Sequence, residues 1–379
     1  MRVSIDGAAP VDVPLSLSAE RASQQSRWTE AIAAAVRHHV RILGAPAAGT
    51  IRIVDRNVGA PLWSSHRRMA VEAAVARSVA ESFWTDAIPC DADRRWFVDG
   101  LARYTSTAAV AAQNQSEHES ASVGMFEARF AGGFLPWVLP ASVPAWTAGS
   151  GVTAFRAHRR IMPGPEASAA GRDAVEMRVA LAMETLSSWT GGPMWDAALR
   201  AFVDAARGRC ASWQDLQATA ADVTGLDLSW FFDQAFASDR DFDYGVEELT
   251  SVRADGAAER YRTNLVVRRY GDAMFTGTIE PPLEPFESGR GVEIAVRFAD
   301  GVERVERWDG RAASRRFTWE SGSPAQSATV DPRQVILLDI NRTNNSRTIA
   351  PRAAAAAARW SVVWTVWLEH LLLSFGSLV

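Results

Sequence analysis

The chain has 379 residues, which is enough for two or three domains with their own hydrophobic cores. Its 47% hydrophobic and 22% charged residues exclude a largely disordered chain, and its formal net charge of −4 lacks the concentrated positive charge that nucleic-acid binding needs. We therefore expect no nucleic-acid partner. All 40 basic residues are arginine, so chemistry that depends on a lysine amine is excluded.

The first part of the chain is predicted to be mostly helical. Apolar residues at helical spacing predict a helix over about 18–43, and I-R-I-V-D predicts a short strand over 51–55. A second helix is expected from about 65 to Trp84, and a third from about 91 through Tyr104. Gly, Pro and Ser interrupt every periodic pattern between 120 and 165.

Cysteine use and the N-terminus give expectations about compartment. Cys90 and Cys210 are the only cysteines, and two isolated cysteines form neither a disulfide framework nor a cluster of metal ligands. We expect two free thiols. The N-terminal residues M-R-V-S-I-D-G-A-A-P contain no apolar segment, so no secretory signal and a cytoplasmic globular part are expected.

The second part of the chain changes its period. Four helical patterns occupy 166–237, separated by G-G-P at 191–193, by Gly208 and by Gly225. After Asp243 the apolar period becomes two, as in R-T-N-L-V-V-R-R-Y and V-E-I-A-V-R-F. This pattern is typical of an antiparallel β-sandwich of about 100 residues.

Two stretches carry a resemblance to a known family. The first is V-A-R-S-V-A-E-S-F-W from Val75, and the second is W-F-V-D-G-L-A-R-Y from Trp96. They resemble the V-A-H-E-x-A-H-Q-W-W and W-L-N-E-G-F-A-x-Y helices of the alanyl aminopeptidases, which are zinc peptidases of the gluzincin group. M-W-D-A-A-L-R-A-F and G-L-D-L-S-W-F-F-D-Q-A-F look like the helices that follow the metal site in the same family.

The resemblance implies an α+β multidomain protein. It predicts a thermolysin-like, mostly helical catalytic-type domain over 1–240, an antiparallel β-sandwich over 241–348 and a C-terminal apolar helix over 349–379. The exopeptidase motif G-x-M-E-N and the β-saddle domain of the family are missing, and there is no tyrosine between Tyr104 and Tyr244 for the family's catalytic tyrosine.

The same resemblance implies that the zinc ligands are lost. The two histidines and the third ligand, a glutamate, correspond to Arg77, Glu81 and Asp99, and the general base corresponds to Ser78. Zinc needs three ligands from His, Cys or carboxylate, and a peptidase also needs a base. A permanent cation at Arg77 opposes Zn²⁺, and a serine cannot accept a proton near neutral pH. We therefore expect no catalytic residue, no cofactor and no metal.

Arg77 offers its own hypothesis. Its guanidinium can take the place of the metal by bridging Glu81, one helical turn away, and Asp99 on the next helix. The alternative is an ordinary i, i+4 pair of Arg77 and Glu81 on a solvated face.

The helical spacing also indicates candidate residues of a cleft. The helical spacing places His66 and Trp84 on the side of the former metal site, and Tyr104 follows on the next helix, so all three are expected to line a cleft. A relocated metal site of His66, His158 and Glu72 is a less favoured possibility.

The last twenty residues form an apolar segment. W-S-V-V-W-T-V-W-L-E-H-L-L-L-S-F-G-S-L-V over 360–379 has the length of a membrane span, but Glu369 and His370 interrupt it. It fits a tail anchor or interfacial helix, a docking helix for a partner, or a helix packed on the chain's own domains.

The functional expectation is a catalytically inactive aminopeptidase-like protein. In this hypothesis the old cleft holds a peptide or protein segment, and 360–379 attach the chain to the cytoplasmic face of a membrane or to a membrane protein. The alternative is a hydrolase with an altered zinc site built from Glu81, Asp99 and His66. A third possibility is a purely structural subunit.

Overall fold

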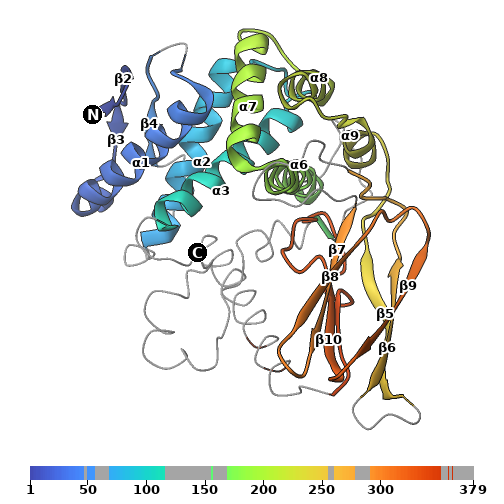
Figure 1. Ribbon diagram of the computed structural model, residues 1–379. Coiled ribbons are helices and arrows are strands. Elements are labelled where there is room, and N and C mark those ends of the chain that lie inside the picture. Colours follow the sequence, from blue (N-terminus) through green and yellow to red (C-terminus); the bar gives the residue numbers. More distant parts are fainter. Residues whose placement is uncertain are drawn as a thin grey trace. The chain divides into compact units, whose positions relative to one another are not determined.

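The computed structural model describes residues 1–46, 49–55, 68–115, 155–156, 169–254, 260–277 and 291–350, together with Ala357 and Ser361. These residues form two compact units (Figure 1). The first contains Met1–Ser187 and Gly191–Thr224, and the second contains Ser188–Thr190 and Gly225–Ala355, as far as these ranges are described. Helices dominate the first unit and antiparallel sheets the second, which confirms a mixed α and β fold.

The first unit opens with a small strand region packed on a long helix. β1 (Arg2–Ile5) and β2 (Ala8–Asp12) form an antiparallel hairpin, and β3 (Leu15–Ser16) pairs in parallel with β4 (Ile53–Val54). After a 3-10 turn at Ala19–Gln24, α1 runs over Gln25–Leu43. Its buried face recurs every three to four residues, which is the spacing of an amphipathic helix; the members include Trp28, Ile32, Val36 and Val40.

Five further helices complete the described part of this unit. They are α2 (Arg68–Ala87), α3 (Trp96–Gln115), α6 (Ala169–Thr190), α7 (Gly192–Ala206) and α8 (Trp213–Thr224). α3 and α6 approach each other closely at Gly100, where a Cβ would overlap the side chain of Val179. Gly191 ends α6 in a left-handed conformation with φ of 92°, so that α7 can begin at once with Pro193 in its first turn.

The second unit contains two antiparallel sheets that pack on each other. One has the strand order β5 (Tyr244–Arg253), β6 (Tyr261–Arg269) and β9 (Ser314–Ser321). The other has the order β11 (Ser346–Thr348), β10 (Ala325–Val330), β7 (Val292–Phe298) and β8 (Glu303–Trp308). β5 and β10 are in contact across the two layers. Alternating burial along β6 and β7 follows the period of two in the sequence.

α9 (Ser229–Phe236) belongs to the same compact unit as these sheets. Its Gln234 donates a hydrogen bond to the carbonyl of Met274 at 2.9 Å and accepts one from the Met274 amide at 2.7 Å. The ring of Trp230 lies 5.2 Å from that of Phe275. These contacts explain why this compact unit includes the residues from Gly225 onward.

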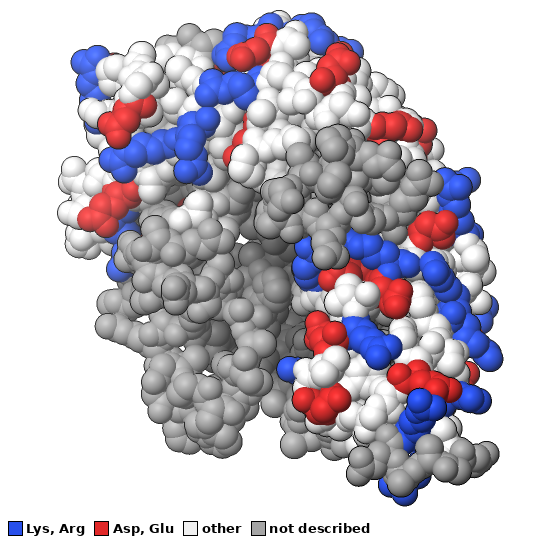
Figure 2. Space-filling model, viewed as in Figure 1, with Lys and Arg blue, Asp and Glu red and all other residues white. Residues whose placement is uncertain are grey.

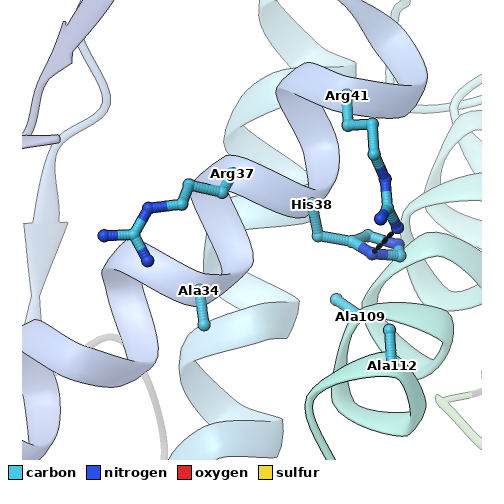
Figure 3. Close-up of a pocket in the computed structure, with 6 residues that line it drawn as sticks. All are labelled: Ala34, Arg37, His38, Arg41, Ala109 and Ala112. Atoms are coloured by element: carbon cyan, nitrogen blue, oxygen red, sulfur yellow. Dashed lines mark hydrogen bonds between the residues drawn. The ribbon is translucent and has the colours of Figure 1, made fainter. Parts of the chain in front are cut away.

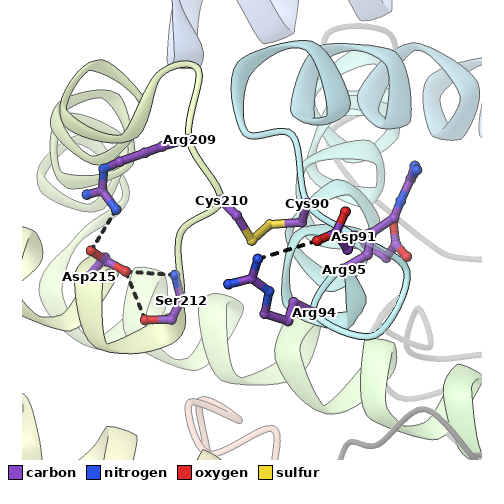
Figure 4. Close-up of a disulfide and its surroundings, with 9 residues drawn as sticks. Cys90, Asp91, Arg94, Arg95, Arg209, Cys210, Ser212 and Asp215 are labelled. Carbon is purple, nitrogen blue, oxygen red and sulfur yellow. Dashed lines mark hydrogen bonds and ion pairs between the residues drawn. A yellow bond between two sulfur atoms is a disulfide. The ribbon is translucent and has the colours of Figure 1, made fainter.

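The two cysteines are joined, so the expectation of two free thiols was wrong. Cys90 follows α2, and Cys210 lies between α7 and α8 (Figure 4). The bond links positions that are 120 residues apart in the sequence. Beside it, the Gly208 amide donates a hydrogen bond to the carbonyl of Ala87 at 2.9 Å. Two isolated cysteines that are far apart in a sequence give no sign that they pair, which is why the sequence did not predict this disulfide bond.

Charge is distributed evenly over the described surface that Figure 2 shows. Blue and red side chains alternate there, and neither forms a large continuous area. The predicted C-terminal helix, 360–379, lies outside the described residues except for Ser361. Within the described ranges, no helix combines the length and the hydropathy that a bilayer crossing requires.

Candidate functional site

The position expected for the first metal ligand holds an arginine between two carboxylates. Arg77 lies in the middle of α2, and its Nε donates to Oε1 of Glu81 at 2.6 Å, one turn along the same helix. Its Nη2 donates to Oε2 of Glu176 on α6 at 2.8 Å. The side chains of Arg77 and Glu176 are only 28% and 21% exposed. The guanidinium therefore bridges two helices through a pair of charge-assisted hydrogen bonds.

A second arginine extends this arrangement to α3. Arg103 forms an ion pair with Asp173, and its Nη1 also lies 3.7 Å from Oε2 of Glu176. Glu176 thus accepts from Arg77 while facing Arg103. We call Arg77, Glu81, Arg103, Asp173 and Glu176 the α2–α3–α6 charge network. Its formal charge is −1, from two arginines and three carboxylates.

The α2–α3–α6 charge network keeps Arg77 charged. Burial alone would lower the pKa of Arg77, but the attraction of Glu176 and Glu81 outweighs burial and raises this pKa above its ordinary value. A guanidinium has no lone pair to offer a metal ion, and this one is also fixed by its partners. The charge at this place is structural and does not depend on pH in the physiological range.

Asp99, the second expected partner of Arg77, is paired with another arginine. Asp99 lies in the first turn of α3 and accepts a hydrogen bond from Nε of Arg95 at 2.8 Å, so it is paired along its own helix. Arg95 also donates to Thr85 at 2.8 Å. Glu176 takes the place that the sequence assigned to Asp99. Ser78, in the expected position of the general base, is half-buried on α2.

Trp84 does not line an open cleft, because its side chain is fully buried. Its indole Nε1 donates to the hydroxyl of Thr105 at 3.0 Å, and Nε2 of His39 lies 3.2 Å from the same hydroxyl. Nδ1 of His39 in turn lies 2.7 Å from the carbonyl of Ala35. Burial lowers the pKa of His39 to about 4, so this ring is neutral and forms part of a polar core network.

Tyr104 is also enclosed, with only 4% of its surface exposed. Its hydroxyl forms a hydrogen bond with Ser187, and burial, followed by the charge of Glu184, raises its pKa. Glu184 was not singled out from the sequence. Burial raises the pKa of Glu184 to about 7, with a further contribution from Asp196 on α7. Its place in the helical pattern M-E-T-L gave no sign of this, because Asp196 comes from another helix.

The described residues at the former metal positions do not fit a zinc site. Glu81 is paired with Arg77 and Asp99 with Arg95, so both carboxylates already neutralise a guanidinium. Within the described ranges, no three His, Cys, Asp or Glu side chains are grouped as metal ligands. His66 and His158, which the other expected ligand sets require, lie outside those ranges, while Glu72 is buried on α2.

Comparisons with known proteins agree with this architecture. No protein-family model matches the chain, and no curated protein matches it. Among solved structures it is similar to Legionella pneumophila aminopeptidase A in complex with aspartic acid, with a TM-score of 0.56 at 10% sequence identity. The match covers 89% of this chain and 37% of that protein, so the chain spans little more than a third of its length. This similarity shows an aminopeptidase-like fold.

Proposed function

We propose that this chain is a catalytically inactive relative of the gluzincin aminopeptidases that binds a peptide or protein segment. The observation that carries the proposal is the pairing of Arg77 with Glu81 and Glu176, at the position where the sequence resemblance places a zinc ligand. A fold can keep its architecture after its chemistry is lost, so the residues at the site decide the function. Here those residues bind one another and leave no base and no metal ligand set.

The exposed end of the charge network suggests the chemistry of the ligand. The side chains of Glu81 and Asp173 are 43% and 36% exposed, whereas the two arginines that neutralise them are the more buried partners. Solvent therefore meets carboxylates first. A segment with lysine or arginine side chains, or with a free α-amine, has the charge that these carboxylates would attract.

The disulfide bond bears on the cellular compartment in which the protein folds. Disulfide bonds persist in oxidising compartments and are rare in the cytosol. Because Cys90 and Cys210 are joined, we infer that the globular part matures under oxidising conditions, in place of the cytoplasmic location expected from the sequence. Attachment through 360–379 stays a prediction.

A peptide-retention experiment tests the function and its rivals together. The protein is incubated with a mixture of short synthetic peptides, separated by gel filtration, and the retained peptides are identified by mass spectrometry. We expect the wild-type protein to retain intact basic peptides. Glu81→Gln should retain several-fold less peptide than wild type. Glu30→Gln, which removes an exposed carboxylate from α1, should retain as much as wild type. Cleaved peptides together with about one equivalent of bound zinc would establish the altered-site hydrolase instead. Retention of no peptide would leave a structural subunit.

A further inference from the structure

A pocket lined by α1 and α3 contains no residue of the α2–α3–α6 charge network. It has a volume of about 260 Å³, opens to solvent, and lies between α1 and α3 (Figure 3). Its lining contains two arginines, one histidine and three alanines: Ala34, Arg37, His38, Arg41, Ala109 and Ala112. None of its described lining residues is a carboxylate. The pocket is therefore electropositive, with a small apolar floor.

The histidine has a defined tautomer. Nη2 of Arg41 lies 3.2 Å from Nδ1 of His38. A guanidinium can only donate, so Nδ1 accepts and the neutral ring carries its hydrogen on Nε2. Burial, followed by the charges of His39 and Arg41, lowers the pKa of His38 to about 3, which keeps the ring neutral at physiological pH.

The Nε2–H group of His38 has no acceptor among the described residues. The atom is buried and has no hydrogen-bond partner within the described part of the chain. A buried donor without an acceptor costs free energy and calls for an explanation. The ring points from α1 toward Ala109 and Ala112 on α3, so its donor borders the pocket (Figure 3).

The two arginines of the pocket differ in their interactions. Arg37 is exposed and, within the described residues, has no ion-pair partner. Arg41 is held by its hydrogen bond to His38, and its charge also lowers the pKa of Asp196, which burial raises. Figure 3 shows the guanidinium of Arg37 on the other side of α1 from His38 and Arg41, so Arg41 is the cation that lies beside the histidine.

We propose that this pocket binds a small oxyanion, as a carboxylate or a phosphate group, beside Arg41, with His38 donating to it. Guanidinium groups bind both anions in a planar, charge-assisted manner. The volume limits the ligand to a small molecule, since ligand pockets usually measure roughly 300 to 1,000 Å³. The alanine floor accepts a short aliphatic chain, which favours a small organic acid over a bare ion.

Calorimetric titration with sodium butanoate and with inorganic phosphate tests the proposal on the full chain. We expect saturable binding of one equivalent, and a loss of about tenfold in affinity when Arg41→Gln removes a charge-assisted hydrogen bond. Arg2→Gln, which removes an exposed arginine of β1, should bind as wild type does. Tighter binding of butanoate than of phosphate would identify the organic acid as the preferred source of the anion, and the reverse order would identify phosphate.

A size variant separates the pocket from surface charge. Ala112→Leu fills the floor without changing any charge, and we expect it to abolish butanoate binding. Ala111→Leu, the adjacent residue, is its control because it does not line the pocket. Binding that survives Ala112→Leu unchanged, or that Arg2→Gln weakens as much as Arg41→Gln does, would overturn the proposal. Absence of saturable binding of either anion by wild type would do the same.

Discussion

Arg77 and Glu176 are 99 positions apart in the sequence, yet Nη2 of the arginine lies 2.8 Å from Oε2 of the glutamate. Their contact joins α2 to α6 at the place where the sequence resemblance expects a metal ion to join neighbouring helices. A metal centre and an ion pair both hold helices together by opposite charges. The ion pair does so with residues that are part of the chain and cannot be removed by a chelator.

The first prediction concerns the stability that this contact supplies. Arg77→Ala should lower the free energy of unfolding by about 1–3 kcal/mol, because it leaves Glu81 and Glu176 without their shared cation in a half-buried place. Arg94→Ala is the control, since the Arg94–Asp91 pair is exposed and such pairs contribute about 0–1 kcal/mol. Denaturant unfolding of the three proteins measures both values. Equal stability of Arg77→Ala and wild type would show that Arg77 forms only a solvated surface pair.

The second prediction restores the lost ligands. The combined variant Arg77→His, Ser78→Glu, Glu81→His and Asp99→Glu should take up about one equivalent of zinc. It recreates two histidine ligands and a glutamate as the third ligand, at the spacing of the family. Elemental analysis after extensive washing measures the metal. The control carries Arg77→Ala, Ser78→Glu, Glu81→Ala and Asp99→Glu, which lacks both histidines. A folded combined variant with no more zinc than this control would refute the correspondence of these positions with a metal site.

The third prediction concerns the pH dependence of stability. The pKa of Glu184 is raised to about 7 in the folded chain, so the folded state holds a proton that the unfolded state releases at a lower pH. Its contribution to stability is therefore full below the ordinary glutamate pKa and is lost as the pH rises toward 7. Glu184→Gln cannot ionise. Relative to wild type, the variant should gain up to about 2–3 kcal/mol of stability between pH 4.5 and pH 7.5.

The comparison with a variant is needed because two histidines act in the opposite sense. The pKa of His38 is lowered to about 3 and that of His39 to about 4, so their contributions grow as the pH rises toward the ordinary histidine value. These contributions cancel when Glu184→Gln and wild type are unfolded at the same pH. The exposed Glu30→Gln serves as the control, and a difference independent of pH for Glu184→Gln would contradict the assignment.

The fourth prediction concerns the disulfide. Replacing both Cys90 and Cys210 by alanine should lower the free energy of unfolding by about 2–5 kcal/mol, because the tie no longer restricts a loop of 120 residues in the unfolded chain. Reductant should lower the melting temperature of wild type and leave that of the double variant unchanged. A wild-type melting temperature that does not respond to complete reduction would contradict a stabilising role.

Local patterns predicted much of the fold but little of the site. The helices α2 and α3 and the strands β6 and β7 follow from periods of three to four and of two, which need only neighbouring residues. Arg77 and Glu81 could be paired from their spacing on one helix. Glu176 could not, because the packing of α6 against α2 that brings it to Arg77 is not encoded in any local pattern.

Other misses have similar causes. Trp84 was expected in a cleft because it shares a helix side with Arg77, but it is fully buried and donates a hydrogen bond to Thr105 of α3. The hairpin of β1 and β2 precedes the first helical pattern and contains Gly7 and Pro10, so its alternation is hard to recognise in so short a stretch. The aminopeptidase-like similarity, by contrast, rested on two motifs whose helices the structure contains.

The Cys90–Cys210 bond also changes what a single cut in the backbone would do to this molecule. A protease that cleaves anywhere between the two cysteines produces two fragments that stay covalently joined through sulfur. The nicked molecule would keep its mass on a gel run without reductant and would separate into two bands only after reduction. α2, before the first cysteine, and α8, after the second, would therefore remain parts of one covalent molecule even when the connection through the chain is gone.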